Sequence, residues 1–345
     1  MDDLFQPYPL LALVGQTELK MALLLGLINP GVGGVLLSGP YGVGKTTAVR
    51  ALLDVMPVVA RPNAEAGTAP HHERMRLVEL PLNARLDDVV GGINERIALE
   101  QERIQLEPGI LALADGNLLY VDEINLLDAA VVDAILDAAA QGRTFVRRGP
   151  MTRLFSSRFM LVGSMNPEEG ELRPQIMDRF GLRVWVAPLA EPRQRLEVYR
   201  RAQAFRSDAA AFRIAYAKQT AALADELASA RAILPHVTVP PTLEEQALDL
   251  VQRLEIPSHR AEIALLEGAR ARAAADFRNV VNSEDLRRVA PLALRQRHSP
   301  HVAIHAQRHA AEQQTINAAL DAIISPPRQP SRRRSAMRQI EEAQS

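Results

Sequence analysis

A run of consecutive residues near the start of the chain has the types and spacing of a phosphate-binding loop. It fits G-x-x-x-x-G-K-[ST] at every position, and its residues are Gly39, Pro40, Tyr41, Gly42, Val43, Gly44, Lys45 and Thr46. Glycines let the backbone form a concave nest of N–H donors around phosphate oxygens, and a helix that begins here adds partial positive charge. Lys45 would reach the β- and γ-phosphates, and the Thr46 hydroxyl would ligate Mg²⁺. The sequence therefore predicts a site for a nucleoside triphosphate and Mg²⁺, with Thr47 beside the loop.

A second chemical feature is the pair of acids, Asp122 and Glu123, that follows the apolar run Leu118–Val121. In an open α/β sheet the carboxyl ends of the strands form the edge at which ligands bind. We expect Asp122 to hold Mg²⁺, directly or through water, and Glu123 to polarise the attacking water. Such a run can also be a plain strand end, and the upstream loop is what makes it informative.

Candidate groups for the γ-phosphate follow further along the chain. Asn166 ends the apolar run Phe159–Met165, and its amide could orient the lytic water, although Asn-Pro also favours a turn. Arg173, Arg179 and Arg260 are candidate phosphate clamps, because the guanidinium is a planar and permanently charged fork. The alternative for any one arginine is a solvated surface position.

The elements that must position these residues follow from apolar periodicity. Residues 1 to about 190 alternate strand-like and helical runs, which predicts an α/β fold with a sheet covered by helices. The expected strands are Val35–Ser38, Arg76–Leu80, Leu118–Asp122, Phe159–Ser164 and Arg183–Val186. The expected helices are Thr17–Leu27, Thr46–Val55 and Ala129–Gln141, and a strand pair is expected within Gly142–Phe159.

The strand pattern ends near Pro192, which divides the chain into further parts. We expect a helical linker over residues 191–235, a compact all-α domain over 236–325 and a disordered tail, rich in proline and arginine, over 326–345. The helices of this all-α domain are predicted at Thr242–Arg253, Ser258–Arg278 and Ser283–Gln296.

Composition excludes several classes of protein. With 345 residues, 47% of them hydrophobic, the chain can bury a large core, and its net charge of −1 creates no general attraction to nucleic acid. No apolar run is long enough to span a membrane, and the acidic N-terminus lacks the pattern of a secretion signal. Cysteine is absent. These features predict a cytoplasmic protein without disulfides.

Together the motifs resemble those of AAA+ ATPases and, more narrowly, of the ATPase subunit I of magnesium chelatase. The most specific segment runs from Gly163 to Gln175 and continues through Ile176-Met177-Asp178-Arg179-Phe180-Gly181. It is similar to the family's sequence across sensor 1 and the arginine finger. Other similar segments are Leu13-Val14-Gly15-Gln16, Glu107-Pro108-Gly109, Tyr120 to Leu127 and Arg287 to Leu294.

The resemblance implies a AAA+ domain with a mostly parallel sheet between helices, followed by the all-α lid. Asn166 would be sensor 1, Arg260 would be sensor 2 on the lid, and Arg179 would be the finger that enters the ATP site of a neighbouring subunit. Val14 and Gln16 would lie near the adenine. Leu86–Ile110 would form an insertion in helix 2, and Gly142–Arg158 a hairpin before sensor 1.

The resemblance also implies a homo-oligomeric ring, expected to be a hexamer, and two further partners. These are a subunit-D-like AAA+ protein with an integrin-like domain and a porphyrin-binding catalytic subunit. ATP hydrolysis would drive insertion of Mg²⁺ into protoporphyrin IX, a ligase reaction of chlorophyll or bacteriochlorophyll biosynthesis. Met165 stands where the family usually has glycine, and the segment Val58–Glu73 is shorter than is typical.

Two alternatives share the ATP chemistry. One is a MoxR-like chaperone ATPase that works with an integrin-like partner. The other is a helicase-like ring on DNA, which the near-neutral charge and the few basic residues of the hairpin disfavour. A histidine series, His298, His301, His305 and His309, has helical spacing. It could bind a metal, but a polar helix face is the interpretation that we favour.

Overall fold

The computed structural model of the chain describes residues 6–61, 71–94, 97, 100, 105–149, 151–297, 314, 315 and 318. Residues Met1–His298 form one compact unit. The histidine series and the expected tail over 326–345 lie outside the described residues. In the part of the chain that is described, no helix is long and apolar enough to cross a membrane.

A five-stranded parallel sheet lies at the centre of the nucleotide-binding part, in the order β11-β1-β10-β7-β4. Every residue of β1, β7 and β10 is buried, as expected for parallel strands covered on both faces. All five predicted strands are confirmed to within one residue. Their bounds are β1 (Val35–Ser38), β4 (Leu77–Leu80), β7 (Leu118–Val121), β10 (Met160–Met165) and β11 (Leu182–Trp185).

Helices cover the two faces of this sheet and bury two apolar cores. On β1, Val35 and Leu37 belong to one core and Leu36 to the other, which is the alternation that a pleated strand imposes. The first core contains residues of α1 (Thr17–Ile28), α2 (Lys45–Arg50) and the short turn η3 (Ala51–Asp54). The second contains residues of α3 (Leu86–Val90), α5 (Ile110–Leu113), α6 (Ala129–Gln141) and α7 (Pro174–Asp178).

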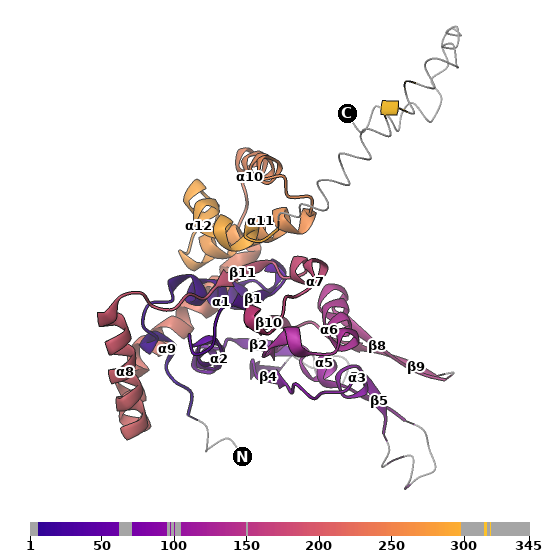
Figure 1. Cartoon of the computed structure of the whole chain (residues 1–345), viewed down its shortest axis with the longest axis horizontal. Coiled ribbons are helices and arrows are strands. Elements are labelled where there is room, and N and C mark those ends of the chain that lie inside the picture. Colours follow the sequence, from indigo (N-terminus) through magenta and orange to yellow (C-terminus); the bar gives the residue numbers. More distant parts are fainter. Residues whose placement is uncertain are drawn as a thin grey trace. The chain divides into compact units, whose positions relative to one another are not determined.

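Outside the main sheet, the described residues form three antiparallel strand pairs. The predicted hairpin is confirmed as β8 (Arg143–Arg148) and β9 (Met151–Ser156), and Figure 1 shows it projecting away from the sheet. The side chain of Arg148, near its tip, forms an ion pair with Asp87 of α3. The other pairs are β2 (Val58–Arg61) with β3 (His71–Arg74), and β5 (Gly91–Ile93) with β6 (Leu106–Pro108).

Most of the described chain after β11 is helical, and Figure 1 shows α10, α11 and α12 grouped beside β11. The central helix α11 is rich in buried alanine, which lets α1, α9, α10 and α12 pack closely around it. It ends at Ala275, earlier than predicted, because Phe277 has a left-handed backbone with φ 55°. The bounds are α8 (Pro192–Ser207), α9 (Ala209–Ile233), η6 (Leu234–His236), α10 (Pro241–Arg253), α11 (His259–Ala275) and α12 (Ser283–Leu294).

Gly181 joins the loop before β1 to the start of β11. Its amide donates to the carbonyl of Gly33 at 3.2 Å, and a Cβ at this position would lie 1.5 Å from the carbonyl oxygen of Val32. We expect Gly181→Ala to force these backbones apart and to lower the free energy of unfolding by about 1–3 kcal/mol or more. Gly92→Ala is the control, since its Cβ would meet its nearest neighbour at 4.0 Å. Equal thermal unfolding midpoints for the two variants would contradict the expectation.

Candidate nucleotide-binding site

The phosphate loop connects β1 to α2 and has the open, concave backbone that its sequence predicts. Gly42 and Gly44 have φ values of 72° and 90°, and a Cβ on either would meet no atom within 4 Å. Their conformation favours glycine, and the space beside them is free for a ligand. Gly39 lies against the neighbouring strand instead, because a Cβ there would approach the carbonyl oxygen of Val186 to 2.3 Å.

Lys45 lies at the start of α2 and bends back over the loop. Its ammonium donates to the carbonyl oxygens of Gly39 at 2.5 Å and Pro40 at 2.9 Å. Burial lowers its pKa, while the carboxylates of Asp122 and Glu123 oppose that shift. The charge is therefore held within the concavity, where phosphate oxygens would be bound.

The hydroxyl and carboxylate groups expected at a magnesium site lie together. Thr46 Oγ1 donates to Asp122 Oδ2 at 3.1 Å, although the two residues are far apart in the sequence. The Tyr120 hydroxyl donates to Asp122 Oδ1 at 2.8 Å, and the hydroxyl of Ser164 donates to the same oxygen. Hard oxygen ligands of this kind suit Mg²⁺, so the donor set fits the expected metal.

Glu123 follows β7 in a left-handed conformation with φ 50°, which is strained for a residue with a side chain. Its amide donates to Ser164 Oγ at 3.1 Å, which ties this turn to β10. Burial, together with the negative charges of Glu169 and Asp122, raises the pKa of Glu123 above its ordinary value. A carboxylate with a raised pKa is a stronger base, as water activation requires.

Asn166 follows β10, the strand that lies between β1 and β7, so it lies between the phosphate loop and the acidic pair. The residue is only 1% exposed, and its Oδ1 accepts from the amide of Glu168 at 3.2 Å. Among the residues that the structure describes, Nδ2 of Asn166 forms no hydrogen bond of ordinary geometry, and the Asn166 side chain interacts with the Tyr41 hydroxyl of the phosphate loop. An unpaired buried donor is costly, and an anionic oxygen of a ligand would satisfy it.

The segment that contains Val14 and Gln16 packs against the end of β11. Gln16 Nε2 donates to the carbonyl of Ala187 at 2.9 Å, just after β11. In the same region the amide of Val186 donates to Ser38, the last residue of β1, at 2.7 Å. The segment thus lies beside the end of β11, which is next to β1, and its contact with an adenine base stays a prediction. Thr47 is exposed on α2.

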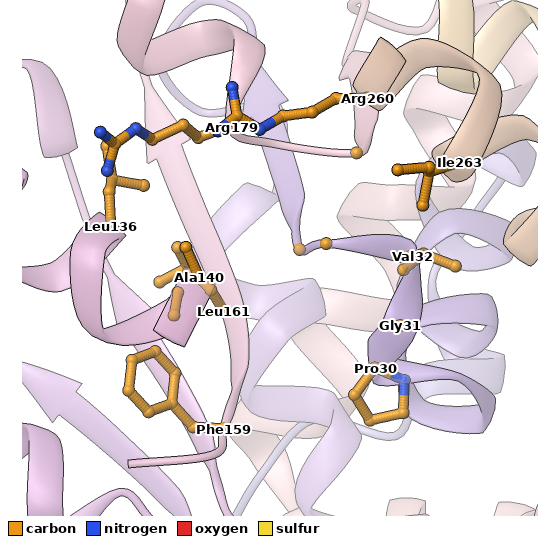
Figure 2. Close-up of a pocket in the computed structure, with 14 residues that line it drawn as sticks. Pro30, Gly31, Val32, Leu136, Ala140, Phe159, Leu161, Arg179, Arg260 and Ile263 are labelled. Atoms are coloured by element: carbon orange, nitrogen blue, oxygen red, sulfur yellow. The ribbon is translucent and has the colours of Figure 1, made fainter. Parts of the chain in front are cut away.

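The arginines predicted for the γ-phosphate lie elsewhere. Arg179 and Arg260 line one cavity of about 440 Å³ together with Pro30 and Phe159, and no residue of the phosphate loop lines it. Figure 2 shows the two arginine side chains at one end of this cavity and Phe159 and Pro30 at the other. Among its described lining residues there is no carboxylate. Arg173, the third candidate, is exposed at the N-terminus of α7.

The carboxylate of Asp178 holds this region together. It accepts from Ser258 at 2.7 Å, from Arg260 at 3.2 Å and from Arg297 at 2.7 Å, and Arg183 lies 3.7 Å away. Burial alone would raise its pKa, but the hydrogen bond from Ser258 and the charges of Arg297 and Arg260 hold the pKa below its ordinary value. The ionised carboxylate of Asp178, the residue before Arg179, thus contacts both β11 and the lid.

Arg179 itself is fixed against the second face of the sheet, where its Nη1 donates to Asp137 of α6 at 2.6 Å. The sequence motifs gave no role to Asp137, Asp178, Arg183 or Arg297. A charged residue within the apolar run Leu182–Val186 was an available signal for Arg183, which is only 2% exposed. For Arg297 the sequence held no such signal, because it follows the last lid helix.

The sheet order, the phosphate loop after β1, the acids after β7 and the helical lid define a AAA+ ATPase fold. Residues 244–320 match the AAA lid domain, and residues 10–176 match the family "Magnesium chelatase, subunit ChlI". The chain belongs to this magnesium chelatase family, as the sequence motifs had indicated.

Two named relatives support that assignment. The magnesium-chelatase 38 kDa subunit of Acidiphilium rubrum is 43% identical over 312 residues, which cover 84% of this chain and 90% of the relative. The magnesium-chelatase 38 kDa subunit of Cereibacter sphaeroides is 40% identical over 308 residues, covering 85% and 92%. A solved structure from Cytophaga hutchinsonii shares the fold, with a TM-score of 0.58 at 22% identity over 88% of this chain and 90% of that one.

The site makes a binding prediction that the only tryptophan of the chain can report. Trp185 is 45% exposed at the end of β11 and pairs with Ser38, directly before the phosphate loop. We expect MgATP to change the fluorescence of Trp185, and Lys45→Ala to weaken that binding by at least about 10- to 100-fold, because a charged hydrogen-bond donor is lost. Lys218→Ala, at an exposed position of α9, is the control. Equal affinities for wild type and Lys45→Ala would remove Lys45 from the site.

Proposed function

We propose that this chain is the ATPase motor subunit of a magnesium chelatase and that it works as a ring of identical subunits. The observation that carries the proposal is the separation of two incomplete halves of one catalytic site. The phosphate loop, the Thr46–Asp122 pair, Glu123 and Asn166 lie together on one side. Arg179 and Arg260 lie together on a different cavity. A second copy would join the two halves.

Within one copy, the residues divide the work as their chemistry suggests. The loop amides and Lys45 would hold the β- and γ-phosphates, and Thr46 and Asp122 would hold Mg²⁺, which neutralises charge on the phosphate oxygens when bound. Glu123 would accept a proton from the attacking water, and Asn166 would orient that water or the γ-phosphate. Arg179 and Arg260 of the adjacent copy would stabilise the charge of the transition state.

The energy of hydrolysis would be exported as motion between copies. Asp178 directly precedes Arg179 and accepts a hydrogen bond from Arg260 of the lid. A displacement of Arg179 at the shared cleft would therefore move the lid as well. We infer from the family that a subunit-D-like partner and a porphyrin-binding subunit receive this motion, and that Mg²⁺ is inserted into protoporphyrin IX on the latter. Stimulation of ATPase activity by porphyrin in a reconstituted mixture would separate this function from that of a MoxR-like chaperone.

The raised pKa of Glu123 predicts the acid side of the pH profile. Glu123 must be ionised to accept a proton, so activity is full above its pKa and is lost as the pH falls through it. Glu169→Gln removes a negative charge that raises this pKa, so the acid limb of the kcat profile should move to lower pH. Glu171→Gln is the control, and Glu123→Gln should bind MgATP without turnover. An acid limb that is the same in wild type and Glu169→Gln would contradict the assignment.

Mixing variants tests whether the site is shared between copies. Arg179→Ala should keep its affinity for MgATP but lose about 10³- to 10⁵-fold in hydrolysis. Lys45→Ala should be inactive because its own phosphate loop no longer binds the nucleotide. A mixture should regain activity, since the loop of one variant can meet the intact arginine of the other. The rate of phosphate release is measured at several mixing ratios of the two variants. A rate that stays at the level of the separate variants at every ratio would exclude an arginine supplied by the neighbour.

A further inference from the structure

Arg297 lies shortly after the end of α12, and its side chain is 0% exposed. A guanidinium has five N–H donors, and all of them are used here. Nε donates to the carbonyl of Ala293 at 2.6 Å. Nη1 donates to the carbonyl and to Oδ1 of Asp178 at 3.3 and 2.7 Å, and Nη2 donates to the carbonyls of Phe180 and Gly181 at 2.9 and 3.0 Å.

These acceptors lie on both sides of Arg179 along the chain. Three backbone carbonyls and one carboxylate from the segment Asp178–Gly181 converge on one cation, so the backbone that carries Arg179 is held at several points. The remaining acceptor, Ala293, is in the last turn of α12, where unpaired helix carbonyls attract positive charge. Lysine could not form this set, because its ammonium has three donors and no planar fork.

The segment that carries Arg297 is itself anchored to the sheet. Arg183 of β11 donates from Nη1 to the carbonyls of Arg295 at 3.3 Å and Gln296 at 2.6 Å. Burying a guanidinium is costly unless it is paired and fully hydrogen-bonded, and Arg297 meets both conditions through Asp178 and the carbonyls. None of the partners of Arg297 belongs to the phosphate loop. Arg297 therefore contacts the segment that carries Arg179 and not the segment that would bind the phosphates.

We propose that Arg297 is a positioning residue for Arg179. Arg297 fixes the position of the backbone that carries Arg179 relative to the ATP of the neighbouring copy. Because Arg297 also contacts α12, the position of Arg179 depends on the position of the lid. This inference rests on the proposed function, because it assumes that Arg179 acts on a neighbour's nucleotide. It predicts that the lid of one copy controls hydrolysis in the next.

Arg297→Met tests the proposal, since methionine keeps much of the apolar stem and removes every donor. A displacement of about 1 Å in a catalytic group can cost about 10²-fold in rate, so kcat should fall by about that factor. The affinity of the same protein for MgATP, read from Trp185, should stay within about twofold of wild type, because the loop is untouched. The kcat of Arg297→Lys should lie between those of wild type and Arg297→Met, because the positive charge remains at the site.

Mixing assigns the defect to one side of the cleft. Arg297→Met mixed with Lys45→Ala should regain activity, because the latter supplies an intact Arg179. Arg297→Met mixed with Arg179→Ala should stay inactive, because neither protein supplies one. Arg270→Met is the matched control: Arg270 also donates to carbonyls within the lid, those of Leu234 and Val237, but it does not contact the segment Asp178–Gly181. It should keep its rate per folded molecule.

A measurement that needs no activity completes the test. Amide hydrogen exchange in residues 174–182 should be faster in Arg297→Met than in wild type and Arg270→Met. Unchanged exchange there, a wild-type kcat, or rescue by Arg179→Ala would each overturn the positioning role. Failure of both mixtures in a folded protein would do so as well. If wild type itself does not hydrolyse ATP, the proposed function fails, and exchange alone then decides whether Arg297 holds this segment.

Discussion

The position of β10 between β1 and β7 is the constraint on which the nucleotide site depends. Parallel order brings the ends of these three strands to one edge, so the phosphate loop, Asn166 and the acidic pair meet without any direct sequence proximity. The hydroxyls of Thr46, Tyr120 and Ser164 then converge on a single carboxylate. Small errors in strand register would break this set, and the close approach of Gly39 to Val186 leaves β1 little freedom to slide along β11.

A second network, built from arginine, joins the sheet to the lid. Arg183 and Arg297 are both buried, and burial lowers the pKa of each, to about 9 for Arg183. The charge of Arg297 is tolerated because backbone carbonyls and Asp178 accept hydrogen bonds from all of its nitrogens. Arg183 donates from Nη1 to two carbonyls, while its Nε and Nη2 have no hydrogen-bond partner among the described residues. Polar networks are strong when they are complete, so Arg297 is the stronger of the two anchors. Between them, the two buried arginines connect the segment after α12 to β11 and to the segment that carries Arg179, so the last lid helix and that segment are held together.

Much of this arrangement could be predicted from the sequence. The phosphate loop and the strands carry strong local signals, because glycine spacing and buried apolar runs are set by nearby residues. The placement of Arg260 could not be read in this way. Its motif indicated a residue on the lid, but only the packing of α11 against the loop before β1 shows that it lies beside Arg179. The roles of Asp178 and Arg297 were also hidden, since their partners are distant in the sequence.

The two faces of the proposed site differ, one carrying the nucleotide and the other carrying the arginines. Copies joined in this way form a head-to-tail series, in which each contact completes one site. An open row of subunits therefore always has one nucleotide face without a partner and one arginine face left over. When the row closes into a circle, these two unpaired faces meet. The last interface then adds a catalytic site without adding a subunit. Catalytic output would then depend on closure itself, and a fragmentary arc would be less active per chain than a complete circle.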